Sequence, residues 1–341
     1  MELLATLAQS LLSPMVLAFL LGLIAALVRS DLKIPEPLYA AMTIYLLFGI
    51  GLKGGAKLDG VSPADFAGPA VAAVALCLVI PAWSFAILRR FGRLSADDAG
   101  AVSAHYGSVS VVTYGACVAF LEARQVPQEG FLPALLALME VPGIVVALLL
   151  AQLARRAPAP ALVPARSHAF LAPGFEAAPW GKLLHELFTS KGILLLLGGL
   201  LIGLASGQTG YQQVGPFFDV PFRGVLTIFL LEMGLVTGRR LGDLRSAGFF
   251  LGIFALLMPL LHGLLGVWVA RNVGLSLGGA TALGTLAASA SYIAAPAAVR
   301  VALPQANPAL YVTASLAITF PFNLVLGIPL YFGFASWLYA A

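Results

Sequence analysis

Long apolar runs dominate the chain, and polar residues fall mostly in short stretches between them. The runs are continuous rather than alternating, which predicts helices and not the strands of a membrane β-barrel. A helix crosses the hydrocarbon core of a bilayer in about 20 residues. On this basis we expect ten membrane-spanning helices, at residues 14–29, 35–52, 66–89, 98–121, 128–154, 190–207, 221–238, 246–271, 276–299 and 307–338.

One longer polar stretch separates the fifth and sixth predicted spans. It covers residues 155–189 and contains five prolines, Pro158, Pro160, Pro164, Pro173 and Pro179. This composition is typical of a linker, and we expect a short interfacial helix within it near 180–188. The chain therefore divides into a first unit at 1–154, a linker at 155–189 and a second unit at 190–341.

The composition excludes a soluble protein. Hydrophobic residues make up 60% of the 341 residues and charged residues only 10%, with a mean hydropathy of +0.96. An ordinary globular domain carries roughly a quarter charged residues, because its surface faces water. This chain must be solvated mainly by the lipid bilayer, so we predict an all-α, multi-pass membrane protein.

The distribution of charge indicates the orientation of the chain. Ten spans place both termini on one side, and if that side is outside, fourteen of the 19 Lys and Arg residues face the cytoplasm. The remaining five are Lys53, Lys57, Arg124, Arg223 and Arg271. The positive-inside rule therefore predicts both termini outside a bacterial cytoplasmic (inner) membrane. The basic residues form no stripe or tail, so no nucleic-acid partner is expected.

The two units resemble each other in sequence. At a shift of 181 residues, Gly22 matches Gly203, Ser108 matches Ser289, Ser110 matches Ser291 and Pro127 matches Pro308. Because each unit has five spans, an odd number, the second must be inverted relative to the first. Two inverted five-helix repeats are typical of secondary transporters, whose sites lie near the membrane midplane.

The fourth and ninth spans are rich in Gly, Ser and Ala at their centres, at 103–115 and 287–296. Such segments can interrupt a helix and free backbone N–H and C=O groups. If the two interrupted helices cross, their positive N-terminal ends favour a small anion, and nearby hydroxyl and carbonyl oxygens favour a cation such as sodium. The alternative is that small residues here only allow close helix packing.

Several ionisable or polar residues lie inside predicted spans. Glu140, beside Pro142, is the stronger candidate for a sodium ligand, because an intramembrane carboxylate needs a proton, a partner or an ion. Glu232 has no such context and is expected to pair with Arg223 or His262 if the fold brings them together. In the tenth span, Thr319 and Asn323 are further candidate ligands. His105 and His262 are candidates for proton relay or, alternatively, for packing.

No motif in the sequence indicates an enzyme. There is no Gly-rich phosphate-binding loop, no histidine pair of a metalloprotease helix, and no nucleophile with its base. We therefore expect no catalytic residues and no nucleotide-driven transport within this chain.

Several short motifs together resemble those of the sodium-dependent bicarbonate transporters of the SbtA type. They are Ser13-Pro14, Leu17 to Leu20, Ile34-Pro35-Glu36, Gly51-Leu52, Gly54-Gly55, Met139 to Pro142, Phe222-Arg223-Gly224, Ser276 to Gly279, and Ala306-Asn307-Pro308. The resemblance covers nearly the whole chain outside the linker. It implies a ten-helix inverted-repeat fold, sodium-coupled bicarbonate uptake, a homotrimer, and a PII-like regulator on the cytoplasmic side.

The resemblance also assigns site residues, with two departures from the cyanobacterial pattern. Val111-Val112 replaces Gly-Ser in the fourth-span turn, and Tyr292 replaces an acidic residue after the ninth-span serines. The anion is predicted to bind at Gly107, Ser108, Ser110, Val111, Val112, Thr113, Ser289, Ser291 and Tyr292. Sodium is predicted to bind at Glu140, Ser110, Ser291, Thr319 and Asn323.

The leading hypothesis is a sodium-coupled symporter that imports bicarbonate or a similar small anion by alternating access. A neighbouring hypothesis is a sodium- or proton-coupled transporter of a small organic monocarboxylate, with the pocket altered at Val111, Val112 and Tyr292. A proton-coupled exchanger using Glu140, Glu232 and His105 is a further alternative. The last is a membrane receptor or scaffold that transports nothing.

Overall fold

The computed structural model describes residues 2–58, 60–156 and 180–340, and all regular secondary structure in these ranges is helical. By length and composition, seven helical segments there can cross a membrane: Glu36–Leu58, Pro63–Arg90, Ala96–Ala123, Leu132–Arg155, Lys191–Asp219, Gly248–Asn272 and Pro308–Ala340. Two more apolar helices, Pro14–Leu27 and Leu277–Ala288, are shorter. The prediction of an all-α membrane protein is confirmed.

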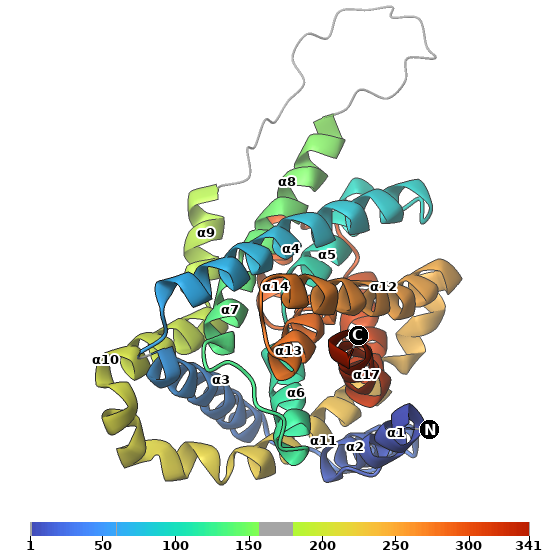
Figure 1. The fold of residues 1–341 in the computed structure, drawn as a ribbon. Coiled ribbons are helices and arrows are strands. Elements are labelled where there is room, and N and C mark those ends of the chain that lie inside the picture. The colour runs from blue at the N-terminus through green and yellow to red at the C-terminus, as the bar shows by residue number, and fades with distance from the viewer. Residues whose placement is uncertain (1, 59, 157–179, 341) are drawn as a thin grey trace, which may run out of the picture.

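Within 2–156 and 180–340 the described helices follow one another with short connections (Figure 1). In the first unit they are α1 (Glu2–Leu11), α2 (Pro14–Leu27), α3 (Glu36–Leu58), α4 (Pro63–Arg90), α5 (Ala96–Gly107), α6 (Val111–Ala123), α7 (Leu132–Met139) and α8 (Pro142–Arg156). After α9 (Trp180–Phe188) come α10 (Lys191–Asp219), α11 (Phe222–Arg240), η1 (Leu241–Asp243), α12 (Leu244–Asn272), α13 (Leu277–Ala288) and α14 (Ala294–Ala302). The last span comprises α15 (Pro308–Val312), the π-helical η2 (Thr313–Thr319), α16 (Phe320–Phe322), the π-helical η3 (Asn323–Gly327) and α17 (Ile328–Ala340).

Local sequence explains where several helices begin. Ser13, Ser62 and Asn307 each precede a proline, and their side chains accept hydrogen bonds from backbone amides of the first turn of α2, α4 and α15. Proline is suited to the first helical position because the amide it lacks would have no partner there. A polar cap satisfies one of the remaining free amides.

Two pairs of helices pack at very short distance through glycine. Gly51 and Gly55 of α3 face the α10 backbone, and Gly203 of α10 faces the α3 backbone at Leu52. In the second pair, Gly22 of α2 faces α11 and Gly234 of α11 faces α2. A methyl group at any of these positions would overlap the opposing backbone. Glycine therefore permits the close backbone approach that is typical of membrane helix pairs.

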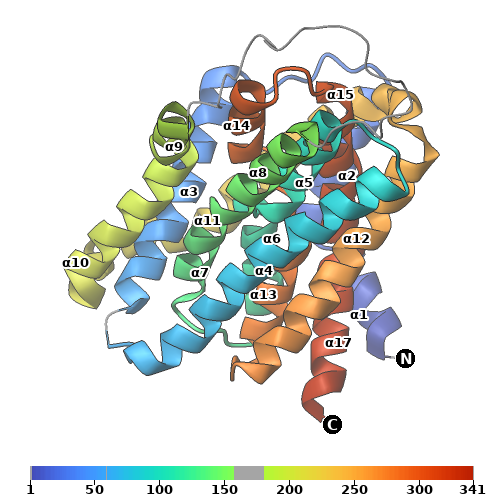
Figure 2. The same ribbon diagram turned by 90° about the horizontal axis from the view of Figure 1, so that it is seen from above.

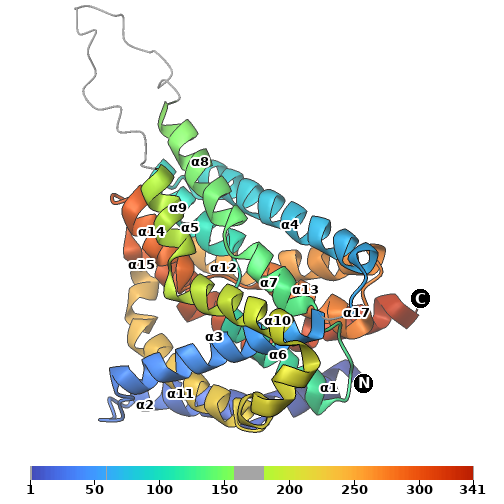
Figure 3. The ribbon, with the colours of Figure 1, turned by 90° about the vertical axis from the view of Figure 1, so that its left-hand side faces the viewer.

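These four helices, α2, α3, α10 and α11, form a layer along one side of the molecule (Figures 1 and 3). The segment α5–α6 lies in the interior, since 94% of its most apolar stretch is buried, against 22% for α10. The outer layer and the interior segment therefore have different surroundings, with α10 largely exposed on the surface of the chain.

Parts of the structure differ from the sequence-based expectations. Residues 2–11 form α1, for which no helix was predicted. α10 does not end near residue 207 but bends at Gly207, with φ 59°, and continues to Asp219. The expected helix at 180–188 is confirmed as α9. Most of the predicted linker, 157–179, lies outside the described residues.

The two ends of the chain lie at the same end of the molecule (Figure 2). α9, α14 and α15 lie at the opposite end in the same view. The described helices therefore run between two faces, with N- and C-termini sharing one of them.

The glycine contacts give a first prediction. Substitution Gly203→Val should lower the melting temperature of the purified protein in detergent, because the side chain would force α10 away from Leu52, and overpacking costs about 1–3 kcal/mol. Gly198→Val on the same helix is the control, since no neighbouring atom lies within 4 Å of a Cβ there. Equal melting temperatures for the two variants would contradict this description of the α3–α10 contact.

Candidate functional site

The fourth predicted span is interrupted at its centre. α5 ends at Gly107, residues 108–110 are non-helical, and α6 begins at Val111. Ser110 caps α6: its Oγ accepts hydrogen bonds from the Thr113 amide at 3.2 Å and from the Thr113 hydroxyl at 3.0 Å. The free amides at the start of α6 therefore point toward the interruption.

The ninth predicted span is interrupted in the same way. α13 ends at Ala288 and α14 begins at Ala294, and residues 289–293 are non-helical. The Ser291 hydroxyl oxygen accepts from the Ala295 amide at 3.3 Å. The break thus occurs at the Ser-Ala-Ser segment, with Pro296 in the first turn of the helix that follows.

The two interruptions are in direct contact. The Ser110 backbone amide donates to the Ser289 hydroxyl oxygen at 2.9 Å, and the Ser291 amide donates to the His105 carbonyl oxygen at 2.8 Å. Ser110, Ser289 and Ser291 are all buried. Each interruption therefore supplies hydrogen-bond partners for backbone groups that the other leaves free, as a low-dielectric interior requires.

Glu140 lies beside these interruptions, at the junction of α7 and α8. The Ser108 hydroxyl donates to the Glu140 carbonyl oxygen at 2.8 Å and lies 3.4 Å from its carboxylate oxygen Oε2. Gly143 allows this approach, because a Cβ there would overlap the Gly107 carbonyl. Glu140 is only 6% exposed, and within the described ranges no Lys, Arg or His pairs with its carboxylate.

A small pocket brings together part of the predicted site. Its lining includes Ser110, Val111, Glu140, Ser291 and Tyr292. We call it the central pocket. Leu47 of α3 and Gly192 of α10 also line it, so it lies between the interrupted helices and the outer layer. The Tyr292 hydroxyl lies near Ser110 without a well-formed hydrogen bond.

The other predicted anion-site residues lie next to the central pocket rather than in its wall. Gly107 contacts Gly143, and Ser108 contacts Glu140. Thr113 and Ser289 bond to Ser110. Val112 lines an adjoining apolar pocket. These residues therefore lie next to the residues that line the central pocket.

Thr319 and Asn323 make structural hydrogen bonds on the tenth span. The Thr319 hydroxyl donates to Ala255 O at 2.7 Å, and it lies 2.6 Å from the Tyr106 hydroxyl. The Asn323 amide donates to the C-terminal carbonyl of α13, at Ala288, at 2.9 Å, and its oxygen accepts from Tyr331 at 2.8 Å. Neither residue lines the central pocket. Thr319 is the last residue of the π-helical η2 and Asn323 the first of the π-helical η3, and π-helical turns are frequent at functional sites.

The remaining ionisable residues have other partners than expected. Arg223 pairs with Glu122 at 3.0 Å, and His262 accepts from the Trp83 indole at 2.7 Å. Glu232 instead interacts with the Ile34 backbone and the charge of Arg239, so the predicted pairing of Glu232 with Arg223 or His262 is wrong. His105 bonds to Ala101 O in its own helix at 2.7 Å.

The oxygen atoms around the central pocket favour a cation of low charge. No group of three or more His, Cys, Asp or Glu residues gathers anywhere in the described part of the chain. One carboxylate with hydroxyl and carbonyl oxygens is a donor set for a hard cation of low charge. The amide-rich start of α6 favours an anion nearby.

Sequence reasoning did not identify Leu47, Gly192 or Tyr331 as parts of this region. Leu47 and Gly192 lie within apolar spans and carry no chemical signal. Tyr331 lies eight residues after Asn323 in the same span, and the sequence does not show that its hydroxyl donates to the Asn323 amide oxygen across the π-helical turn.

Discontinuous helices that meet around a buried polar site are typical of one class of protein, the secondary transporters of the membrane. The model of the Na+-dependent bicarbonate transporter superfamily matches residues 14–336, and the chain belongs to this superfamily. The predicted family is thereby confirmed, and it is a family of transporters rather than enzymes. A comparison with curated proteins finds no match.

The contact between the interruptions gives a second prediction. Ser289→Ala should destabilise the protein by about 1–3 kcal/mol, because it leaves the buried Ser110 amide without an acceptor. The measurement is thermal unfolding in detergent. Ser336→Ala is the control, since among the described residues the Ser336 hydroxyl bonds to Phe332 O in its own helix and to no other segment. A melting temperature for Ser289→Ala as high as that of the control would contradict the assigned bond.

Proposed function

We propose that the protein is a sodium-coupled symporter that imports bicarbonate or a similar small anion. The observation that supports it is the central pocket, where two helix interruptions meet Glu140, a buried carboxylate with no basic partner among the described residues. A carboxylate in that position requires a proton or a cation. Membership of the superfamily favours sodium.

The proposed site places the two ions side by side. Sodium is bound by Glu140 with oxygens of Ser110 and Ser291, and the anion by the hydroxyls and free amides at the start of α6. Sodium lowers the electrostatic cost of placing an anion inside the membrane, so each ion binds better in the presence of the other. Thr319 and Asn323 remain predicted sodium ligands, although their side chains are engaged in this conformation.

We propose that the chain consists of two inverted five-span repeats, 1–154 and 190–341, joined by the cytoplasmic linker, with the interrupted fourth and ninth spans crossing at the site. The glycine contacts support this arrangement. Gly22 and Gly203, which match at the 181-residue shift, make equivalent contacts: Gly22 of α2 with α11, and Gly203 of α10 with α3. Exchange of the repeats would convert one contact into the other.

Alternating access then results from movement of the outer layer against the remaining helices. The central pocket lies at that boundary, with Leu47 and Gly192 on one side and the interrupted helices on the other. A shift of the layer changes which face of the membrane the pocket opens to.

The proposed orientation has both termini outside the bacterial inner membrane. The distribution of basic residues supports it, and both termini lie at the same end of the molecule (Figure 2). The proposal also includes a homotrimer and a PII-like regulator at the cytoplasmic face, for which the family resemblance is the support.

A small organic monocarboxylate is the second candidate substrate. The side chains of Val111 and Tyr292 line the central pocket, and their carbon atoms favour a substrate with an apolar part. If this alternative holds, acetate or pyruvate at micromolar concentration should compete with labelled bicarbonate. Uptake that neither acid reduces would contradict it.

The main prediction concerns sodium coupling. In proteoliposomes that contain the protein, an inward sodium gradient should drive the accumulation of labelled bicarbonate. Glu140→Ala and Ser110→Ala should each reduce the rate of uptake at least tenfold. Ser336→Ala, outside the site, should transport like the wild type. Equal uptake in sodium-free buffer would contradict the coupling, and uptake that follows a pH gradient instead would favour the proton-coupled alternative.

A further inference from the structure

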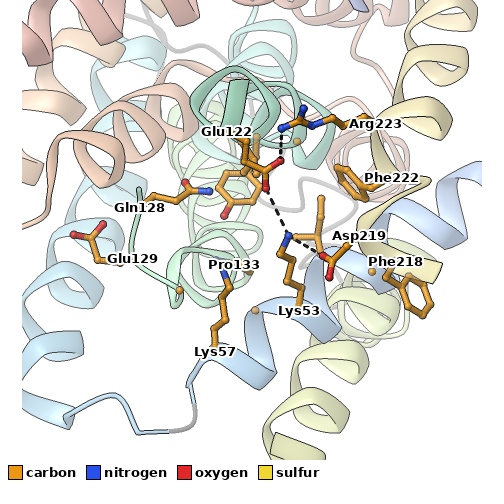
Figure 4. Close-up of a pocket in the computed structure, with 17 residues that line it drawn as sticks. Lys53, Lys57, Glu122, Gln128, Glu129, Pro133, Phe218, Asp219, Phe222 and Arg223 are labelled. Carbon is orange, nitrogen blue, oxygen red and sulfur yellow. Dashed lines mark hydrogen bonds and ion pairs between the residues drawn. The ribbon is translucent and has the colours of Figure 1, made fainter. Parts of the chain in front are cut away.

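A second, charged pocket lies beyond the central pocket, between α3 and α10–α11 of the outer layer and the ends of α6 and α7 (Figure 4). Its lining includes seven charged or amide side chains, those of Lys53, Lys57, Glu122, Gln128, Glu129, Asp219 and Arg223. In the proposed orientation it faces the outside. Its chemistry differs from that of the central pocket, because charged side chains dominate it.

Most of the charges in this pocket are already paired. The Lys53 ammonium lies 2.9 Å from Asp219 and 3.6 Å from Glu122, and Arg223 lies 3.0 Å from Glu122. These four side chains form one network, with two positive and two negative charges. They therefore offer little net attraction to a small ion.

Lys57 is different. Within the described part of the chain its ammonium group forms no ion pair, and Gly130 leaves room for its side chain to pass. The nearby carboxylate of Glu129 accepts from the Ser276 amide at the start of α13 and is directed away from Lys57 in Figure 4. Lys57 is thus the one cation of this pocket that has no ion pair among the described residues.

Gln128 supplies the complementary group. Its side-chain oxygen Oε1 is buried and has no hydrogen-bond donor among the described residues. Leaving such a buried acceptor unpaired is unfavourable, so a ligand that donates a hydrogen bond to it gains affinity. The pocket therefore combines a free cationic donor, Lys57, with a free neutral acceptor, Gln128.

The charged pocket and the central pocket are neighbours of one intervening pocket. It shares Ile50, Gly115 and Phe222 with the adjoining apolar pocket. That pocket in turn shares Leu47, Val111 and Ile293 with the central pocket. The three pockets form a series that begins at Lys57 and ends at Glu140.

We propose that the charged pocket is a first binding site for the transported anion, in which Lys57 binds the negative oxygen and Gln128 accepts a hydrogen bond from the anion's own O–H group. The ligand class is a small protonated oxyanion. Bicarbonate has both a charged oxygen and an O–H group, whereas acetate and nitrate have no O–H to donate. This inference rests on the proposed function and adds a selective step before the central pocket.

The test is the dependence of sodium-driven bicarbonate uptake on external bicarbonate concentration in proteoliposomes. Lys57→Met should raise the half-saturating concentration about tenfold, the range expected when a charge that concentrates an ion is lost, with the maximal rate retained because the central pocket is intact. Gln128→Leu should raise it several-fold. Lys57→Arg keeps the charge and should remain near the wild type.

Lys33→Met is the matched control, because it removes the same exposed charge from a loop outside the three pockets. All variants are first compared by melting temperature, so that a folding defect is recognised. A half-saturating concentration for Lys57→Met equal to that of Lys33→Met would overturn the inference, as would a lower maximal rate with unchanged half-saturation. A wild type without sodium-dependent bicarbonate uptake would overturn the proposed function instead.

Discussion

The structure depends on the satisfaction of backbone hydrogen bonds where two helices are interrupted inside the membrane. In the low-dielectric interior of a membrane, each unsatisfied backbone group costs several kcal/mol. The two interruptions solve this jointly, through the bonds from Ser110 N to Ser289 and from Ser291 N to His105 O. Neither could be stable alone in lipid.

The same requirement extends to the neighbouring spans. Asn323 bonds to the last carbonyl of α13, and Ser108 at the end of α5 bonds to the Glu140 carbonyl. The fifth and tenth spans are therefore each tied to the end of an interrupted helix. The hydrogen bond from Ser108 to the Glu140 carbonyl holds Glu140 in position through its backbone. No basic partner is needed to hold it there.

Much of the fold is encoded locally and was predictable. Continuous apolar runs locate the helices, and the Gly, Ser and Pro residues near 107–110 and 289–296 mark segments where a helix is easily broken. The helix at 180–188 follows from its own amphipathic pattern. Ser110, Glu140 and Ser291 were identifiable because polar groups are rare in such spans.

The rest depends on contacts between distant parts of the chain. Nothing in the sequence around Asn323 shows that its amide is occupied by Ala288 and Tyr331, or that Arg223 pairs with Glu122 rather than Glu232. The helical course of α10 beyond Gly207 was missed because Gly and polar residues there resemble a loop. Leu47 and Gly192 line the central pocket, but no feature of the sequence predicts this.

The glycine contacts constrain how the outer layer can deform. Where the carbonyl of one helix sits against the bare Cα of another, axial sliding of even one residue would drive a side chain into the opposing backbone. These contacts therefore fix the axial register of α3 against α10, and of α2 against α11. Bending of the outer layer is then expected away from these contacts, at points such as Gly207 within α10.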